Sequence, residues 1–108
     1  MKILLLGATG RVGSRIGVQA LGDGHRVVAL VRKPDKLELA GENLTVVQGD
    51  ALNAEDIGNA MQGVDAVVSA LGTDGATTLS ESMPLVIRAM NERGIRRIVS
   101  VGTAGSLR

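Results

Sequence analysis

The chain has 108 residues, of which 44% are hydrophobic and 21% charged, and its formal net charge is +1. This composition is typical of one soluble globular domain over residues 1–108, with no basic surplus for nucleic acid and no run of ~20 apolar residues for a membrane. The lack of cysteine fits a cytoplasmic protein, the single histidine excludes a multi-histidine metal site, and the lack of aromatic residues excludes a tyrosine acid and base stacking.

The chain begins with an apolar run, Lys2–Leu6, that predicts a buried strand. Three glycines follow at Gly-x-x-Gly-x-x-Gly spacing, Gly7, Gly10 and Gly13, and a helical pattern over about 11–21 comes next. Such glycines let the backbone turn tightly and approach a pyrophosphate, while the amides that open the helix face its charge. Because 15 glycines in 108 residues produce this spacing by chance, the position between a strand and a helix is what favours a dinucleotide site.

Four more strands are predicted by short β-branched runs over about 26–31, 44–48, 65–70 and 96–101. Helical patterns separate them, over about 34–39, from the capping residue Asn53 to about 61, and over about 79–93. In the last helix Met83, Ile87 and Met90 are expected to share one side, with the two methionines in the core. The stretches 71–78 and 102–108 are predicted to be loops.

Strands that alternate with crossover helices imply parallel βαβ units, and therefore a doubly wound sheet in an α/β fold with three layers, α/β/α. The glycine motif after the first strand belongs at the switch point of the sheet, so we predict the Rossmann-like strand order 3-2-1-4-5. The alternative order, 2-1-3-4-5, would place the phosphate of FMN in the first loop, where hydroxyl-rich sequences are usual. In the right-handed winding of the predicted order, the first two helices cover one face and the later two the other.

The stretch Gly-Ala-Thr-Gly-Arg-Val-Gly at 7–13 resembles the Gly-Ala-Thr-Gly-x-x-Gly opening of atypical short-chain dehydrogenase/reductases. The group that fits best is that of NAD(P)H-binding, NmrA-like and biliverdin-reductase-B-like proteins. Further stretches match where strands end, at 31–34, 48–51, 69–72 and 100–103. The resemblance covers the whole chain but only the amino-terminal half of a typical member. It therefore implies an NAD(P)-binding Rossmann domain that is truncated at its carboxyl end.

The resemblance also implies which residues bind the dinucleotide. Those near the diphosphate are Gly7, Thr9, Gly10, Arg11, Val12 and Gly13. Asp50 is implied to reach the adenine amino group with Ala51 lining the pocket, and the residues beside the ribose are Ala70, Leu71 and Gly72. The competing interpretation of each stretch is ordinary local structure: a glycine-rich turn, a capping residue or the end of a strand.

The end of the second strand distinguishes the two nicotinamide cofactors. An acidic residue there would accept from the ribose 2′-hydroxyl of NAD, whereas an arginine suits the 2′-phosphate of NADP. Arg32 and Lys33 stand at this point, and Arg11 could close over the adenine from the other side. Asp35 comes too late for the NAD role and is expected to cap the short helix. We therefore expect NADP rather than NAD, with a solvated strand end as the competing interpretation.

Catalytic chemistry is less defined. The Tyr-x-x-x-Lys pair of typical short-chain dehydrogenases cannot form, because the chain has no tyrosine. Ser100 and Thr103 end the fifth strand near the expected nicotinamide position, but no base accompanies them, and no catalytic residue is assigned. Two alternatives follow, an NADPH-dependent oxidoreductase and a non-catalytic NADP(H)-binding module or redox sensor. An epimerase relative is disfavoured by the missing tyrosine.

A final prediction concerns the sheet face on the side of the first two helices. Over the fourth and fifth strands, the remainder of a typical family member would cover this face. Without it, alternate residues among Val67, Val68, Ile98 and Val99 should be exposed beside the open edge of the fifth strand. We therefore expect the chain to associate with a partner, most simply as a homodimer, through that face or that edge.

Overall fold

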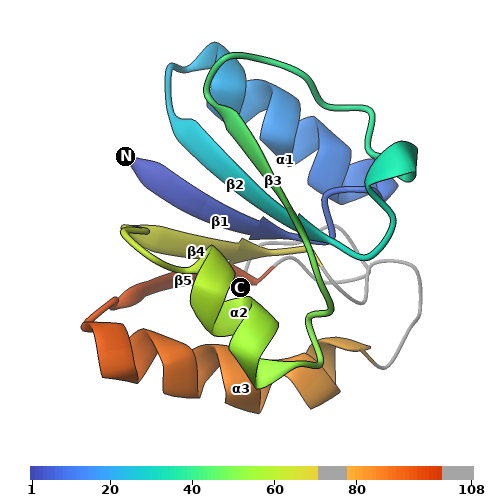
Figure 1. Cartoon of the computed structure of the whole chain (residues 1–108). Helices are drawn as coiled ribbons and strands as arrows, with labels where there is room; N and C mark the ends of the chain where they lie inside the picture. Colours follow the sequence, from blue (N-terminus) through green and yellow to red (C-terminus); the bar gives the residue numbers. More distant parts are fainter. Residues whose placement is uncertain (71–77, 101–108) are drawn as a thin grey trace.

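A computed structural model describes residues 1–70 and 78–100 of the chain (Figure 1). Five parallel strands form one sheet in the order β3-β2-β1-β4-β5, which confirms the predicted order and excludes the alternative. The strands are β1 (Lys2–Leu6), β2 (Arg26–Val31), β3 (Leu44–Gln48), β4 (Ala66–Ser69) and β5 (Arg97–Ser100). Of the loop predicted over 71–78, residues 71–77 lie outside the described residues and Thr78 already begins a helix, while the loop predicted over 102–108 lies wholly outside them.

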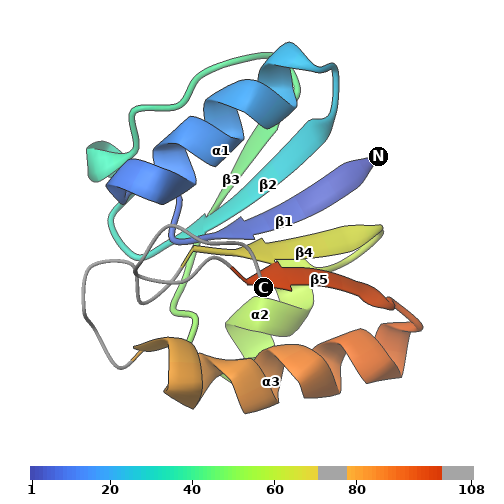
Figure 2. The same ribbon diagram turned by 180° about the vertical axis from the view of Figure 1, so that it is seen from behind.

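Helices cover both faces of the sheet, as Figures 1 and 2 show. The four helical elements are α1 (Arg11–Gly22), the single 3-10 turn η1 (Pro34–Lys36), α2 (Ala54–Ala60) and α3 (Thr78–Arg93). α1 lies against one face, whereas α2 and α3 lie side by side against the other. The right-handed winding of parallel βαβ units explains this division, and the predicted three-layer arrangement is confirmed.

The two faces of the sheet carry separate apolar clusters, because successive side chains of a strand point to opposite faces. On the α1 side the buried members are Leu5, Ala8, Val27, Ala29, Val31 and Leu39. On the other side, strand residues such as Leu4, Leu6 and Val67 pack with Ile57 of α2, with Met61 directly after it, and with Val86 and Met90 of α3. Burial on both faces explains why the inner strands read as continuous apolar runs.

The segment after β2 differs from the predicted helix over 34–39. Only one 3-10 turn forms, and Leu37 already has extended backbone angles (φ −79°, ψ 124°). Leu37 and Leu39 both pack into the α1-side cluster, while Glu38 between them is exposed. Residues two apart share a side only in an extended chain, so burying both leucines prevents a helix. Asp35 lies inside the turn and makes no side-chain cap bond, so the capping role predicted for it is wrong.

The buried side of α3 is also displaced from the predicted one. Met90 is buried as expected, but Ile87 is 39% exposed. The buried positions include Ser82, Val86 and Ala89, so a buried serine occupies the position where an apolar residue would mark the core. These three buried residues are four and three positions apart, a spacing that places them on one face of the helix.

The sheet face expected to be uncovered is exposed in part. Val67 is buried and Ile98 packs against the α2–α3 side, which leaves Val68 and Val99 as the members on the α1 side. Val99 is 39% exposed, whereas Val68 is half-buried against the α1-side cluster. The homodimer stays a prediction, supported here only by one exposed valine on the edge strand β5.

Ser69 at the end of β4 provides a test of the packing. Its side chain is 1% exposed, and its hydroxyl is the one buried side-chain polar group of the described residues that has no hydrogen-bond partner. A buried hydroxyl without a partner costs about 1–3 kcal/mol. We therefore expect Ser69→Ala to leave the free energy of unfolding unchanged or to raise it by about 1 kcal/mol, as measured by urea denaturation. A loss of about 2 kcal/mol or more on this scale would show that the hydroxyl does have a partner.

Candidate nucleotide-binding site

The carboxyl ends of the parallel strands meet at one edge of the sheet, and most of the predicted site residues lie there. Gly7, Arg32, Gly49 and Ala70 each directly follow a strand. Backbone hydrogen bonds align the ends of neighbouring strands. The amide of Gly49 donates to Val31 O, and the amide of Ala70 donates to Leu6 O, both at 2.9 Å. Crevices beyond the carboxyl ends of such strands are where doubly wound sheets bind ligands.

The three glycines of the motif shape a tight turn between β1 and α1. Gly7 has φ +80°, a left-handed conformation that side chains disfavour. The amide of Gly10 donates to the carbonyl of Gly7 at 3.1 Å and closes the turn. A Cβ on Gly13 would lie only 1.9 Å from the same carbonyl oxygen, so the helix touches the strand end backbone to backbone. The turn therefore depends on glycine at its first and third motif positions.

The amino end of α1 opens toward this turn without a capping side chain. Gly10 is the N-cap and makes no side-chain cap bond, and the first turn contains no acidic residue. The first helical bond runs from the Ser14 amide to Gly10 O at 2.9 Å, so the amides of Arg11, Val12 and Gly13 precede the helical pattern. Amides at the positive end of a helix dipole bind anions such as phosphate. The geometry suits a diphosphate.

A hollow of about 140 Å³ lies beside the motif. Its lining residues are Ala8, Thr9, Gly10, Arg11, Ser14 and Glu38. Ser14 and Glu38 were not predicted for the site. Ser14 Oγ donates to Arg11 O at 3.0 Å, which holds the first turn of α1. Glu38 comes from the extended segment after η1, and no sequence pattern places that segment against α1.

Arg32 and Asp50 lie just beyond the carboxyl ends of β2 and β3, respectively. The Arg32 side chain is exposed directly after β2. Asp50 and Ala51 are half-buried in the turn that follows β3. Asp50 Oδ1 accepts from the Leu52 amide at 2.9 Å, so the carboxylate is oriented before any ligand binds. Ala70 is buried at the end of β4, whereas Leu71 and Gly72 lie outside the described residues.

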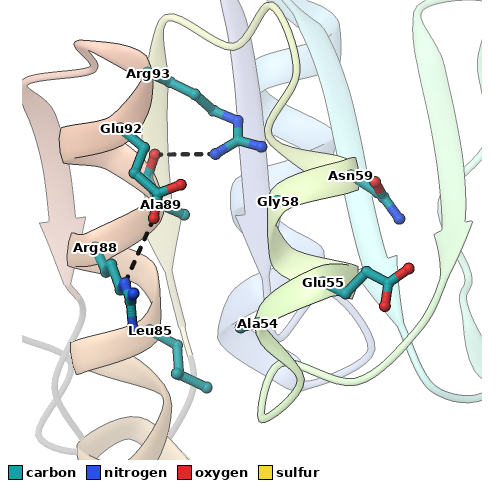
Figure 3. A pocket seen from close by; sticks show the side chains of 9 residues that line it. All are labelled: Ala54, Glu55, Gly58, Asn59, Leu85, Arg88, Ala89, Glu92 and Arg93. Atoms are coloured by element: carbon teal, nitrogen blue, oxygen red, sulfur yellow. Dashed lines mark hydrogen bonds and ion pairs between the residues drawn. The ribbon is translucent and has the colours of Figure 1, made fainter.

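A second hollow, of about 430 Å³, lies between α2 and α3 (Figure 3). Arg88 and Glu92 form an ion pair across one helical turn at 3.5 Å, and Arg93 Nη1 donates to Ala89 O at 3.3 Å. Glu55 and Asn59 point away from α3 in Figure 3. The charged groups of α3 that line this hollow are thus bonded within their own helix, and its lining residues form no convergent ligand set.

Within residues 1–70 and 78–100, no group of three or more His, Asp or Glu side chains could hold a metal ion. The helices of this described part are all too short or too polar to cross a membrane.

A family model described as NAD(P)H-binding matches residues 7–108, from the first glycine of the motif onward. The chain belongs to this NAD(P)H-binding family. The resemblance to atypical short-chain dehydrogenase/reductases is thereby confirmed.

The proteins to which the chain is similar include the photosystem II assembly factor Ycf39 of Synechocystis sp., which is 35% identical over 106 residues. The 3-beta-hydroxysteroid dehydrogenase of Mycolicibacterium neoaurum is 30% identical over 104 residues. These alignments cover 92% and 94% of this chain but only 32% and 28% of the relatives. A solved Rossmann-fold NAD(P)-binding family protein from Shigella flexneri has a TM-score of 0.79 at 27% identity, over 90% of this chain and 49% of that one. The chain therefore spans less than half the length of these three relatives.

The residues of this NAD(P)H-binding chain fit such a cofactor on their own geometry. The Gly7–Gly13 contact brings backbone against backbone where a side chain would block the turn, and the first amides of α1 open onto it. Cationic side chains stand at Arg11, which begins α1, and at Arg32, which follows β2, and a carboxylate stands at Asp50 in the turn after β3. This donor set matches a ligand with phosphates at one end and a base with an amino group at the other.

Proposed function

We propose that the carboxyl edge of this sheet binds NADP(H) in preference to NAD(H), and that the chain is the cofactor-binding part of an NADPH-dependent oxidoreductase. The observation that carries the proposal is the Gly7–Gly13 turn, with the first amides of α1 opening onto the edge where the other strands also end. In the bound state the cofactor supplies a transferable hydride. The residues described here bind and orient it.

Each site residue has a proposed part in that binding. The turn residues Gly7, Thr9, Gly10, Arg11, Val12 and Gly13 hold the diphosphate, Asp50 and Ala51 hold the adenine, and Ala70, Leu71 and Gly72 flank the ribose. The amides that precede the first helical bond of α1 support the first group. The oriented Asp50 carboxylate supports the second, because an acceptor is what the adenine amino group requires.

The preference for NADP rests on charge at the end of β2. Arg32 is exposed directly after the strand, and its planar guanidinium can bind a 2′-phosphate with two parallel hydrogen bonds. The only acidic residue of η1 is Asp35, which lies inside that turn rather than at the end of the strand. Glu38 works against the binding of a phosphate, because this acidic residue lines the same hollow as Arg11 and its negative charge would repel the ligand.

A non-catalytic role is the second candidate, since the chain has no tyrosine to act as a proton donor. The relatives carry names of both kinds, a dehydrogenase and an assembly factor. Incubation of the protein with NADPH and a panel of quinone, flavin and carbonyl acceptors distinguishes the two. Oxidation of NADPH that requires an acceptor supports the oxidoreductase. Saturable binding without oxidation of NADPH supports the binding module.

A further inference from the structure

Three hydrogen bonds, in each of which a side-chain oxygen accepts from a backbone amide, hold the turn between β3 and α2. Asp50 Oδ1 accepts from the Leu52 amide at 2.9 Å, and Asn53 Oδ1 caps α2 by accepting from the Asp56 amide at 3.0 Å. The third bond runs backwards along the chain: the Asp50 amide donates to Asp56 Oδ2 at 2.9 Å, in a partly buried position. Asp56 thus binds the backbone of the residue that is proposed to contact the adenine.

Gly49 provides the space for this bond. A Cβ at position 49 would lie 2.9 Å from both Cβ and Cγ of Asp56 and 3.0 Å from its Oδ2. The backbone of Gly49 is not in the left-handed region, so conformational freedom does not explain the glycine. The contact with the Asp56 side chain does explain it. A side chain at position 49 would push that carboxylate away from the Asp50 amide.

We propose that Asp56, with Gly49 making room for it, is a positioning residue that holds the Asp50 carboxylate where it accepts from the amino group of adenine. This inference rests on the proposed function, because Asp50 has that role only if a dinucleotide binds here. The Asp50 amide is bound by Asp56 and its Oδ1 by Leu52, so backbone and side chain are both held. In this proposal the other oxygen of the carboxylate, Oδ2, accepts from the amino group of adenine.

A carboxylate in the first turn of α2 would also stabilise the helix through its dipole, without any part in recognition. Glu55 separates the two roles. It lies in the same first turn, carries the same charge and is exposed. If Asp56 acts only through the helix, Glu55→Ala and Asp56→Ala should have the same effect on ligand binding.

The test compares NADPH with an analogue in which adenine is replaced by unsubstituted purine, so that only the amino group is missing. The wild-type protein should bind NADPH about tenfold more tightly than the analogue, as expected for a hydrogen bond to a charged group. Asp50→Ala should remove this preference. Asp56→Ala and Gly49→Ala should each reduce it to about twofold while changing the affinity for the analogue by less than about threefold. Asp56→Asn, which keeps an acceptor oxygen, should fall between these variants and the wild type.

Hydrogen exchange of the Asp50 amide measures its hydrogen bond to Asp56 in the absence of a ligand. The exchange should be faster in Asp56→Ala than in the wild type, but not in Glu55→Ala. Equal losses of affinity for both ligands in Asp56→Ala, with the preference retained, would overturn the proposal, as would unchanged exchange at Asp50. Wild-type protein that binds both ligands equally would refute the adenine contact, and with it this proposal, while leaving the binding of a dinucleotide intact. Wild-type protein that binds neither would refute the proposed function, and the exchange experiment would still report whether Asp56 holds Asp50.

Discussion

Replacing Gly13 with alanine is expected to lower the free energy of unfolding by about 3 kcal/mol or more, and the Tm by more than about 10 °C. The new Cβ would lie 1.9 Å from Gly7 O, 2.6 Å from Gly7 C and 3.1 Å from the Cα of Ala8. All three atoms belong to the backbone and cannot rotate away. Relief requires α1 to separate from the end of β1, which opens the α1-side cluster and deforms the proposed diphosphate turn.

Two other glycines of α1 serve as matched controls. A Cβ added at Gly22 would have no atom within 4 Å, so Gly22→Ala should be neutral or stabilising by up to about 1 kcal/mol. At Gly17 the new methyl would meet Leu39 Cδ1 at 2.4 Å, a side chain that can move, so a loss of about 1–2 kcal/mol is expected. Far-UV circular dichroism during heating measures all three. Equal stability of the Gly13 and Gly22 variants would contradict the contact between helix and strand.

Arg32→Ala is expected to weaken NADPH binding by about tenfold to a hundredfold and to leave NADH binding within about twofold. Hydrogen bonds to a charged phosphate are the strong ones, and NADH lacks the 2′-phosphate that would receive them. Calorimetric titration of both cofactors gives the ratio. The NADPH preference should also decrease with added salt, because Arg32 is exposed and its charge is screened.

Arg26 is the matched control, because it is an exposed arginine at the opposite end of the same strand. Arg26→Ala should leave both affinities unchanged. An equal loss for NADPH and NADH in Arg32→Ala would mean that Arg32 contributes to the site without reading the 2′-phosphate. A preference for NADPH that survives in Arg32→Ala would transfer the recognition to Lys33 or Arg11.

The strands and their order could be predicted because each strand is a short apolar or β-branched run that is followed by turn residues. The boundaries of β1, β2 and β3 match the predicted ones, and Asn53 caps α2 as expected. Gly7 signalled the switch point of the sheet. These features depend on local sequence and on the handedness of βαβ units, and neither needs knowledge of distant contacts.

The features that were missed depend on contacts between segments far apart in the chain or on a loop's path. The helix predicted over 34–39 is replaced by an extended segment because Leu37 and Leu39 both pack against the sheet. The buried Ser82 disguises the core side of α3.

In the site, Asp56 suits the helix dipole by sequence, as predicted. Its bond to the Asp50 amide arises only from the curvature of the β3–α2 turn. The glycine at position 49 is the one feature of the sequence that relates to this bond, because a side chain there would collide with that of Asp56.

The most direct test of the central claim is calorimetric titration of the wild-type protein with NADPH, NADH and FMN. We expect saturable binding of one NADPH per chain, weaker binding of NADH, and no binding of FMN. Binding of FMN alone, or no binding of either nicotinamide dinucleotide, would contradict the assignment of the sheet's carboxyl edge as an NADP site.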